Sequence, residues 1–463
     1  HARKLSRFAK EVVIAYDSRR MSREFAEETA LVLCANGVHV FLFDVLRPVP
    51  ILSYAVRHLH AAAGVVITAS HNPPQYNGYK AYWNDGAQMI TPHDKNTIAE
   101  VNKIRSAADI KFKGNPSLIE TIGEEIDSQF IQDLTTLSLS QEAIKRHHDM
   151  KIVYTPIHGT GVKLIPRALA AFGFTNIIHV PEQDVVSGDF PTVKSPNPEE
   201  PAALAMAVAK AKETDAELVL ASDPDADRVG AAVKNNEGEW VLLNGNQTAL
   251  MFVYYLIRRW KELGKIQGKE YIVKTIVTTE TIRTIAEANG VGYYDVYTGF
   301  KWIANVMRQN EGKLKYIGGG EESYGFLCED FVRDKDAVSA CSVLAEIAAW
   351  AKDNSMTMYQ LLQNIYVEYG FSKEQGISVV KKGKSGAEEI EAMMKHYRET
   401  PHTEIAGSKV SHINDFSTLK SFDLLENETI SLDMPTTSNV LQYFTEDGTK
   451  VSIRPSGTEP KIK

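Results

Sequence analysis

The stretch EVVIAYD at Glu11–Asp17 is a short apolar run rich in β-branched residues, which predicts a buried strand. After it, Arg23–Asn36 predicts a helix and Val38–Phe43 a second strand. A helix near Ile51–Ala62 and a third strand at Gly64–Thr68 complete the unit. Strands and helices that alternate at this spacing are typical of right-handed parallel β-α-β units.

The same order of elements returns twice along the chain. The second copy runs from a strand at Ile152–Thr155 to one at Glu217–Ala221, and the third from Tyr271–Ile276 to Leu314–Ile317. After about Phe371 the alternation fades into shorter strands. This pattern predicts three similar α/β domains with mixed or parallel sheets, followed by a smaller α+β domain.

The size and composition of the chain agree with several folded domains. The chain has 463 residues, of which 43% are hydrophobic and 24% are charged. This is an ordinary balance for globular proteins. At roughly 150 residues per domain, the length suggests about three domains rather than one oversized core. The copies place the domains at residues 1–149, 150–243, 244–370 and 371–463.

Composition also disfavours some classes of protein. The formal net charge of −8 argues against general nucleic-acid binding, which needs a basic face. The apolar runs are shorter than the roughly 18 residues of a membrane-spanning helix, and the N-terminal one is too short for a signal-peptide core. We expect Cys34, Cys328 and Cys341 to be buried apolar residues of a cytoplasmic protein, since they are too few and too scattered for a disulfide framework.

Each third strand runs into a polar segment. The three segments read ASHNP at Ala69–Pro73, DPDADR at Asp223–Arg228 and GGGEESYG at Gly318–Gly325. Ligands of open parallel sheets bind beyond the carboxyl ends of the strands. We therefore expect these loops to carry the chemistry of the protein.

Three aspartates alternate along the second of these loops. In an extended segment, Asp223, Asp225 and Asp227 can point to one side and hold a hard divalent cation, for which Mg²⁺ is the natural candidate. The run is not an EF-hand loop, because Arg228 and Lys234 stand where that loop needs Gly and Glu. The alternative is an acidic surface turn, which the buried strand before the loop disfavours.

Ser70 follows the third strand of the first copy, where a serine is often a turn or helix-cap residue. His71, Asn72 and Lys80 lie near it in the sequence. Histidine and lysine can activate a hydroxyl or move its proton, and a phosphoserine could ligate a metal. No G-x-S-x-G elbow surrounds Ser70, so the sequence favours a phosphorylated serine over an acyl-transfer nucleophile.

Two stretches of the third copy could bind a sugar. Glu321, Glu322 and Ser323 lie on a glycine-rich loop that we expect to be flexible, and they offer acceptors for sugar hydroxyls. The sequence GFKW from Gly299 adds the cation of Lys301 and a stacking face. The alternatives are an exposed acidic loop for the first stretch and an ordinary helix start for the second.

A polar stretch near the end of the chain could bind a phosphate. Arg454 supplies a cation that can bind two oxygens at once, and Ser456, Gly457 and Thr458 supply hydroxyl groups and a backbone free to turn its N–H groups inward. The alternative is a polar turn between two strands.

Together, these motifs resemble those of the α-D-phosphohexomutase family, and the whole chain is similar to its four-domain layout. The resemblance implies that the domains surround a central active-site cleft. The resemblance rests on TASHNPPQYNGYK (Thr68–Lys80), DPDADR (Asp223–Arg228), GGGEESYG (Gly318–Gly325) and RPSGTEP (Arg454–Pro460). Similarity to the branch of bacterial phosphoglucomutases and phosphoglucomutase-2-like enzymes rests on AYWNDGAQMITPHD (Ala81–Asp94), YTPIHGTG (Tyr154–Gly161) and TGFKWI (Thr298–Ile303).

The resemblance implies a role for each motif. It implies that the metal ligands are a phosphorylated Ser70, Asp223, Asp225 and Asp227. The implied catalytic residues are Ser70, Arg228 beside it, and His71 or Lys80 for proton transfer. The implied substrate-binding residues are Gly299, Lys301, Glu321, Ser323, Arg454, Ser456, Gly457 and Thr458.

The implied activity is a Mg²⁺-dependent interconversion of glucose 1-phosphate and glucose 6-phosphate, with glucose 1,6-bisphosphate as primer and bound intermediate. The loop Glu321–Gly325 is similar to the glucose-selective version in the family. Alternatives are a phosphomannomutase or phosphopentomutase of the same family, a metal-dependent sugar phosphatase, and a non-catalytic sugar-phosphate sensor.

The implied partner is a small-molecule phosphosugar, with neither nucleic acid nor membrane, and the implied assembly is a monomer or a dimer. The family's N-terminal strand with its glycine-rich, arginine-bearing segment is not found before His1, and the chain stops at Lys463, just beyond the phosphate loop. We therefore expect the first and fourth domains to be incomplete.

Overall fold

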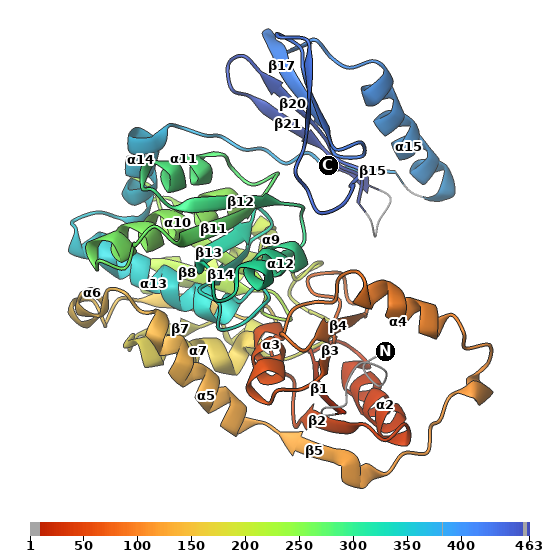
Figure 1. Ribbon diagram of the computed structural model, residues 1–463. Helices are drawn as coiled ribbons and strands as arrows, with labels where there is room; N and C mark the ends of the chain where they lie inside the picture. The colour runs from red at the N-terminus through yellow and green to blue at the C-terminus, as the bar shows by residue number, and fades with distance from the viewer. Residues whose placement is uncertain (1–9, 382, 457–460) are drawn as a thin grey trace. The chain divides into compact units, whose positions relative to one another are not determined.

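Three sheets with the same arrangement of strands form the first part of the protein (Figure 1). In each sheet three parallel strands lie in the order second, first, third, and a further strand pairs antiparallel with the third. The computed structural model describes residues 10–381, 383–456 and 461–463, and its sheets confirm the predicted threefold repeat and the α/β fold class.

The first sheet has the strand order β4-β3-β1-β2-β5. Its strands are β1 (Glu11–Tyr16), β2 (His39–Phe43), β3 (Ala63–Ile67), β4 (Tyr79–Trp83) and β5 (Ile119–Ile122). The accompanying helices are α2 (Ser22–Ala35), α3 (Val49–His58), α4 (His93–Val101), α5 (Glu124–Leu134) and α6 (Gln141–Arg146). Val12 and Ile14 of β1 pack in one cluster with α2, while Val13 and Ala15 pack in another with α3, as expected of a strand buried on both faces.

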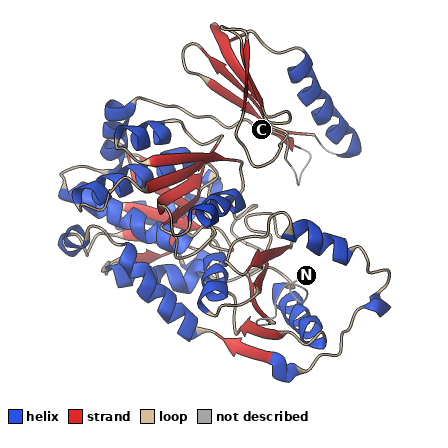
Figure 2. Ribbon diagram, in the orientation of Figure 1, coloured by secondary structure: helices blue, strands red, loops and turns tan. Residues whose placement is uncertain are grey.

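The second sheet has the order β10-β9-β8-β6-β7. Its strands are β6 (Ile152–Thr155), β7 (Ile177–His179), β8 (Leu218–Ser222), β9 (Val229–Lys234) and β10 (Trp240–Leu243). Its helices are α7 (Gly161–Phe172), α8 (Pro181–Asp184) and α9 (Pro201–Thr214). Tyr154 packs in one cluster with α7 and Val153 in another with α9, so helices cover both faces of this sheet too. Figure 2 distinguishes the helices from the strands by colour.

The third sheet has the order β12-β11-β13-β14. Its strands are β11 (Glu270–Thr275), β12 (Gly292–Val296), β13 (Lys315–Glu321) and β14 (Gly325–Cys328). The helices of this copy are α10 (Gly245–Glu262), α11 (Thr281–Ala288), α12 (Phe300–Asn310), α13 (Ala337–Asp353) and α14 (Met358–Tyr369).

The expectation of a flexible glycine loop before Glu321 was wrong. Gly318, Gly319 and Gly320 are buried residues of β13. A Cβ atom on Gly319 would lie 2.2 Å from the carbonyl oxygen of Val273, so these glycines permit close strand packing.

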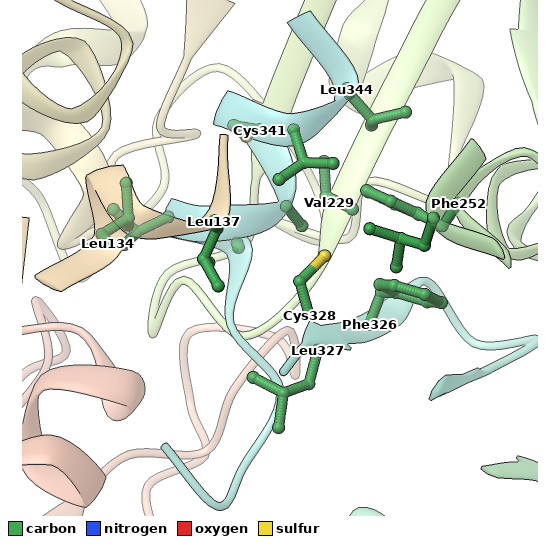
Figure 3. Close-up of a cluster of buried hydrophobic side chains, with 14 of the residues drawn as sticks. Leu134, Leu137, Val229, Phe252, Phe326, Leu327, Cys328, Cys341 and Leu344 are labelled. Atoms are coloured by element: carbon green, nitrogen blue, oxygen red, sulfur yellow. The ribbon is translucent and has the colours of Figure 1, made fainter. Parts of the chain in front are cut away.

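One hydrophobic core joins the three sheets (Figure 3). Leu134 follows the first sheet, Val229 belongs to the second, Phe326 and Cys328 belong to the third, and Cys341 belongs to helix α13. Cys34, Cys328 and Cys341 are all buried and free, which confirms the prediction that they are small apolar residues.

A buried carboxylate also connects helix α13 to residues 138–140 by hydrogen bonds. Glu346 of α13 accepts hydrogen bonds from the backbone N–H groups of Leu139 (2.7 Å) and Ser140 (3.0 Å) and from the hydroxyls of Ser138 (2.5 Å) and Tyr255. A helix of the third copy thus holds the segment that leads from the first copy to the second.

The second unit begins at Lys373, and its described residues form antiparallel sheets and one helix. Its elements are β15 (Val379–Val380), α15 (Gly383–Glu399), β16 (Glu404–Ile405), β17 (Ser408–Asp415), β18 (Lys420–Asp423), β19 (Glu428–Ser431), β20 (Leu441–Thr445), β21 (Lys450–Ile453) and β22 (Lys461–Ile462). Ile390 and Met394 of α15 pack on Ile413 and Tyr443 of the sheet.

The first unit ends at Ser372, so all three α/β copies belong to one compact unit. The expected boundaries at 149/150, 243/244 and 370/371 stay predictions. Among the described residues, no helix combines the length and apolar character that crossing a membrane requires.

Candidate active site

Each of the three polar loops connects a third strand to its antiparallel neighbour. Residues 68–78 connect β3 to β4, residues 223–228 connect β8 to β9, and residues 322–324 connect β13 to β14. The Val229 N–H donates to the carbonyl oxygen of Tyr324 (3.0 Å), which joins the second and third loops. The loops predicted from the repeat therefore lie together at the carboxyl ends of the parallel strands.

Ser70 points its hydroxyl group at the aspartate loop. Its Oγ donates to Asp223 Oδ2 at 2.9 Å and lies 3.3 Å from Nδ1 of His71. The Ser70 backbone has a left-handed φ of 52°, a conformation that costs about 1–3 kcal/mol for a residue other than glycine and persists only where the surroundings hold it. One restraint is the hydrogen bond from Ser70 N–H to Thr68 Oγ1 (2.8 Å).

Asp223, Asp225 and Asp227 converge as predicted, but in a turn rather than in an extended segment. One oxygen from each lies within 4.8 Å of the others, and all three residues are buried. Ala226 adopts a left-handed φ of 52°, and its N–H donates to the carbonyl oxygen of Asp223 at 2.9 Å. The turn brings together side chains that period-two alternation alone would not focus on one point.

The three carboxylates fit a divalent cation. Asp225 Oδ1 and Asp227 Oδ1 are buried and have no hydrogen-bond partner among the described residues. A buried carboxylate oxygen without a partner is costly, and clustered hard oxygen ligands are what Mg²⁺ prefers. Burial, together with the charges of Asp225 and Asp227, raises the pKa of Asp223 well above its ordinary value. A bound cation would compensate this concentration of negative charge.

Lys80 places a positive charge beside the aspartates. Its Nζ donates to Asp225 Oδ2 at 2.9 Å and lies 3.5 Å from Asp227 Oδ2. Burial alone would raise the pKa of Asp225, but Lys80 lowers it below its ordinary value. Burial alone would likewise lower the pKa of Lys80, but the two aspartates raise it. Lys80 is therefore a charged ammonium group at this site.

His71 is held in its neutral form. Burial, assisted by the charge of Arg228, lowers the pKa of His71 to about 2. The Arg228 N–H donates to Asp223 Oδ1 (3.0 Å), while its guanidinium group pairs with Glu199 Oε1 at 2.6 Å. His71 is accordingly uncharged at neutral pH, and its ring can form a hydrogen bond near Ser70.

Glu321 ends β13 and faces two groups that could meet a substrate. Its Oε1 accepts a hydrogen bond from the Gly299 N–H at 2.6 Å, and its Oε2 lies 3.9 Å from Nζ of Lys335. Lys335 also lies 3.1 Å from Asp227 Oδ2. Glu322 turns away, because its Oε2 accepts from Thr275 Oγ1 (3.0 Å). Glu321, rather than Glu322, is thus the acidic group beside the aspartate loop.

The other predicted sugar-binding residues lie in the turn after Glu321 and at the start of α12. Ser323 is a half-buried residue of the turn between β13 and β14. Gly299 is the N-cap of α12 with a φ of 116°, and Nζ of Lys301 lies 5.4 Å from the ring centre of Trp302. The GFKW stretch therefore does start a helix, and its role toward a sugar stays a prediction.

The predicted phosphate cradle belongs to the second unit. Arg454 follows β21 and exchanges two backbone hydrogen bonds of 2.9 Å with Lys463, and Ser456 N–H donates to the carbonyl oxygen of Lys461 (2.8 Å). Gly457 and Thr458 lie outside the described residues. The role of all four residues stays a prediction.

The YTPIHGTG stretch (Tyr154–Gly161) packs against the aspartate loop at residues 223–228. A Cβ atom on Gly159 would lie 2.4 Å from Cα of Pro224, and the Thr160 N–H donates to the Pro224 carbonyl oxygen at 2.8 Å. His158, with a left-handed φ of 64°, is fixed by contacts of Nδ1 with the Val185 carbonyl oxygen (2.7 Å) and of Nε2 with Thr192 Oγ1 (2.8 Å). This motif thus has a structural role next to Asp223 and Asp225.

Sequence reasoning missed three charged residues of the site: Arg19, Glu199 and Lys335. Each comes from a segment outside the four motifs and reaches the loops only through the tertiary structure. A signal for Lys335 was available in the sequence, because the charged run RDKD at Arg333–Asp336 lies shortly after Gly325.

Comparison with protein-family models matches three parts of the chain. The models described as phosphoglucomutase/phosphomannomutase alpha/beta/alpha domains I, II and III match residues 1–108, 128–238 and 244–369. Together they cover more than half of the 463 residues.

Curated relatives that are similar to this chain include two staphylococcal phosphoglucomutases. The phosphoglucomutase of Staphylococcus haemolyticus is 34% identical over 458 residues, which cover 98% of this chain and 81% of that protein. The phosphoglucomutase of Staphylococcus aureus strain MRSA252 is 35% identical over 455 residues, with the same coverage.

Two solved structures share the fold. A putative phosphomannomutase from Thermus thermophilus has a TM-score of 0.71 at 22% identity and covers 98% of this chain and 85% of its own. The phosphoglucomutase parafusin from Paramecium, in an open form, has a TM-score of 0.72 at 16% identity. This match covers 100% of this chain and 83% of the parafusin chain. With its three matched domains and its curated relatives, the chain belongs to the phosphoglucomutase/phosphomannomutase family of α-D-phosphohexomutases and is an enzyme of the mutase type.

Proposed function

We propose that this phosphohexomutase interconverts glucose 1-phosphate and glucose 6-phosphate by phosphoryl transfer at Ser70. The observation that carries the proposal is the 2.9 Å hydrogen bond from Ser70 Oγ to Asp223, inside a cluster of three buried aspartates. The curated relatives, named phosphoglucomutases, support glucose as the hexose. Mannose or pentose phosphates are the alternatives within the family, and the phosphoglucomutase-2-like branch stays a prediction.

Asp223, Asp225 and Asp227, together with a phosphorylated Ser70, would hold Mg²⁺. The cation would neutralise charge on the phosphoryl oxygens. The unpartnered oxygens of Asp225 and Asp227 support this assignment from the structure of the chain itself.

The residues around Ser70 suit the two halves of a phosphoryl transfer. The P–O bond to Ser70 Oγ breaks while a P–O bond to a sugar hydroxyl forms, and the proton of that hydroxyl passes to a base and finally to Ser70 Oγ. Neutral His71 has its Nδ1 3.3 Å from Ser70 Oγ, and it would hold a proton only transiently because burial lowers its pKa. Charged Lys80 is suited to balance negative charge near Asp225, and either residue stays a candidate for the proton transfer.

The sugar must present its 1-oxygen and its 6-oxygen to Ser70 in turn. We assign Glu321 and Ser323 to the sugar hydroxyls, with Gly299 and Lys301 beside them, in two related orientations of bound glucose 1,6-bisphosphate. The residues assigned to the phosphate that is not reacting are Arg454, Ser456, Gly457 and Thr458. The bisphosphate would also prime the unphosphorylated enzyme.

The decisive experiment follows labelled phosphorus. Protein labelled with radioactive phosphate on Ser70 is mixed with unlabelled glucose 1-phosphate, and the expected result is label in the hexose phosphate product. Label found only in inorganic phosphate would instead indicate a phosphatase, and binding without any transfer would indicate a sensor. Parallel kcat/KM measurements with glucose, mannose and ribose phosphates test the substrate, and equal values for glucose and mannose would contradict the glucose preference.

A further inference from the structure

The guanidinium group of Arg19 donates hydrogen bonds to four backbone carbonyl groups of the Ser70 loop. Its Nη1 donates to the carbonyl oxygens of Pro73 and Tyr76, both at 2.9 Å. Its Nη2 donates to the carbonyl oxygen of Ser70 at 2.5 Å and to that of Asn72. Four carbonyl groups within seven residues therefore point at one side chain.

Arg19 is itself rigidly placed. It lies just beyond β1, with its N–H donating to Asp17 Oδ1 at 2.9 Å and its Nε 3.3 Å from Asp17 Oδ2. Both side chains of this ion pair are fully buried. The ring of Phe190 packs on the guanidinium group, 5.0 Å from its carbon, and Ser22 Oγ donates to Asp17 Oδ1 at 2.7 Å. These contacts leave the guanidinium group little freedom to move independently of the loop.

Arginine suits this position for geometric reasons. Its planar group presents donors in a fixed fork, so each Nη nitrogen can serve two carbonyl oxygens, whereas a lysine offers three donors around one point. The four carbonyl groups belong to half-buried or exposed residues. Those shielded from water would each cost about 1–3 kcal/mol without a donor, so we expect the loop to rearrange when the fork is lost.

The contact with the Ser70 carbonyl oxygen bears on the chemistry. The left-handed backbone of Ser70 is held on its N–H side by Thr68 Oγ1 and on its carbonyl side by Arg19. Because the peptide groups on both sides of Ser70 are held, the direction of its Cα–Cβ bond, and with it the position of Oγ toward Asp223, is fixed. The Nη nitrogens of Arg19 are directed at carbonyl oxygens of the loop, so the influence of Arg19 on the reaction passes through the loop.

We propose that Arg19 is a positioning residue for phosphoryl transfer, which fixes the Ser70 backbone so that Oγ faces the aspartates. The inference rests on the proposed phosphoryl transfer at Ser70. Because Arg19 acts through the loop and not on the sugar, its loss should lower kcat much more than it changes KM.

The test compares Arg19→Lys with Arg20→Lys. Arg20 is the adjacent arginine, but its side chain is exposed and pairs with Asp189, so it is a matched control. We expect Arg19→Lys to lower kcat by about 100-fold, the effect of a displacement of about 1 Å at a reacting group, with KM changed by less than about threefold. Hydrogen exchange should quicken at residues 69–78 but not in β1 or β2, and Arg20→Lys should match the wild type in all three measurements.

Wild-type kcat in a folded Arg19→Lys variant would overturn the inference, as would a kcat loss without faster exchange at residues 69–78. If Arg19→Lys does not fold, Phe190→Leu replaces it, because this change keeps Arg19 but removes the ring that packs on it. We then expect a several-fold lower kcat with KM unchanged, and an unchanged kcat would overturn the inference. Ser70→Ala separates the two proposals, since an active Ser70→Ala variant contradicts the proposed function itself.

Discussion

The ammonium group of Lys335 lies 3.1 Å from Asp227 Oδ2. Lys335 belongs to the segment between β14 and α13, yet it reaches the aspartate loop of the second sheet and lies 3.9 Å from Glu321 of the third. Burial would lower the pKa of Lys335, but Asp227 and Glu321 raise it. A fixed positive charge therefore stands between the candidate metal site and the candidate sugar site.

Replacement of this charge should slow the reaction. We expect Lys335→Met to lower kcat by about 100-fold or more, as the loss of one preorganised charge at a reacting phosphoryl group does. The exposed Lys313→Met is the matched control and should keep the wild-type rate. Steady-state kinetics in both directions would check this, and a Lys335→Met enzyme as fast as the control would show that the lysine serves the fold alone.

Ser70→Ala removes the group that we assign as the phosphoryl carrier. We expect kcat below about one hundredth of the wild-type value, because the reaction loses its nucleophile while the fold keeps its core. Intact-mass measurement after incubation with glucose 1,6-bisphosphate should find one added phosphoryl group on the wild type and none on the variant. Ser117→Ala, at an exposed position, is the control. More than about a tenth of the wild-type rate in Ser70→Ala would rule out the phosphoserine mechanism, since tenfold is only about 1.4 kcal/mol of barrier.

The positions of the three loops could be predicted from the sequence because they depend on local periodicity. A buried strand followed at once by polar residues places those residues at a sheet edge, whatever the details of packing. This reasoning located Ser70, the aspartates and Glu321, which the structure brings together in one unit.

The contacts that complete the site could not be predicted in this way, because they join residues far apart in the sequence. Lys335 and Arg19 reach their partners across separate strands and loops. The role of Gly318–Gly320 depends on strand packing against Val273, which gives no periodic signal in the sequence. In the turn at Ala226 an alanine adopts the left-handed conformation, which glycine usually adopts. No glycine in the sequence therefore marked this turn.

Asp225→Asn tests the metal assignment. An amide has no charge for a hard cation, so we expect Mg²⁺ to bind about tenfold more weakly or worse and kcat to fall. Titration calorimetry with Mg²⁺ measures the affinity independently of activity. Asp215→Asn, at an exposed position, should bind Mg²⁺ like the wild type.

Removal of the metal should have a related effect. We expect the purified wild-type enzyme to lose activity in EDTA and to regain it when Mg²⁺ is added in excess. Activity that persists in EDTA, together with unchanged calorimetry for Asp225→Asn, would contradict a cation at the three aspartates.

A buried carboxylate at the start of α13 should make stability depend on pH. Asp336 caps the helix, with its Oδ1 accepting from the N–H groups of Val338 (2.8 Å) and Ser339 (3.1 Å). Its Oδ2 is buried without a hydrogen-bond partner among the described residues. Burial raises the pKa of Asp336 from 3.8 to about 6, against the lowering effect of the capping bonds.

The sign of the effect follows from the raised pKa. The folded protein holds this proton more tightly than the unfolded chain does, so the contribution to stability is fully present below pH 3.8 and is lost as the pH rises through about 6. A shift of this size corresponds to a loss on the order of 3 kcal/mol. A side-chain amide does not titrate, so in Asp336→Asn this part of the pH dependence should vanish.

The measurement is the apparent free energy of unfolding in urea at several pH values from 3.8 to above 6. Other groups titrate in the same range, so the informative quantity is the difference in stability between the wild type and Asp336→Asn at each pH. We expect the wild type to lose stability relative to the variant as the pH rises, whatever the absolute stability of the variant. The exposed Asp149→Asn should run parallel to the wild type. A constant difference for Asp336→Asn would mean that the capping bonds keep this carboxylate ionised in the folded protein despite its burial.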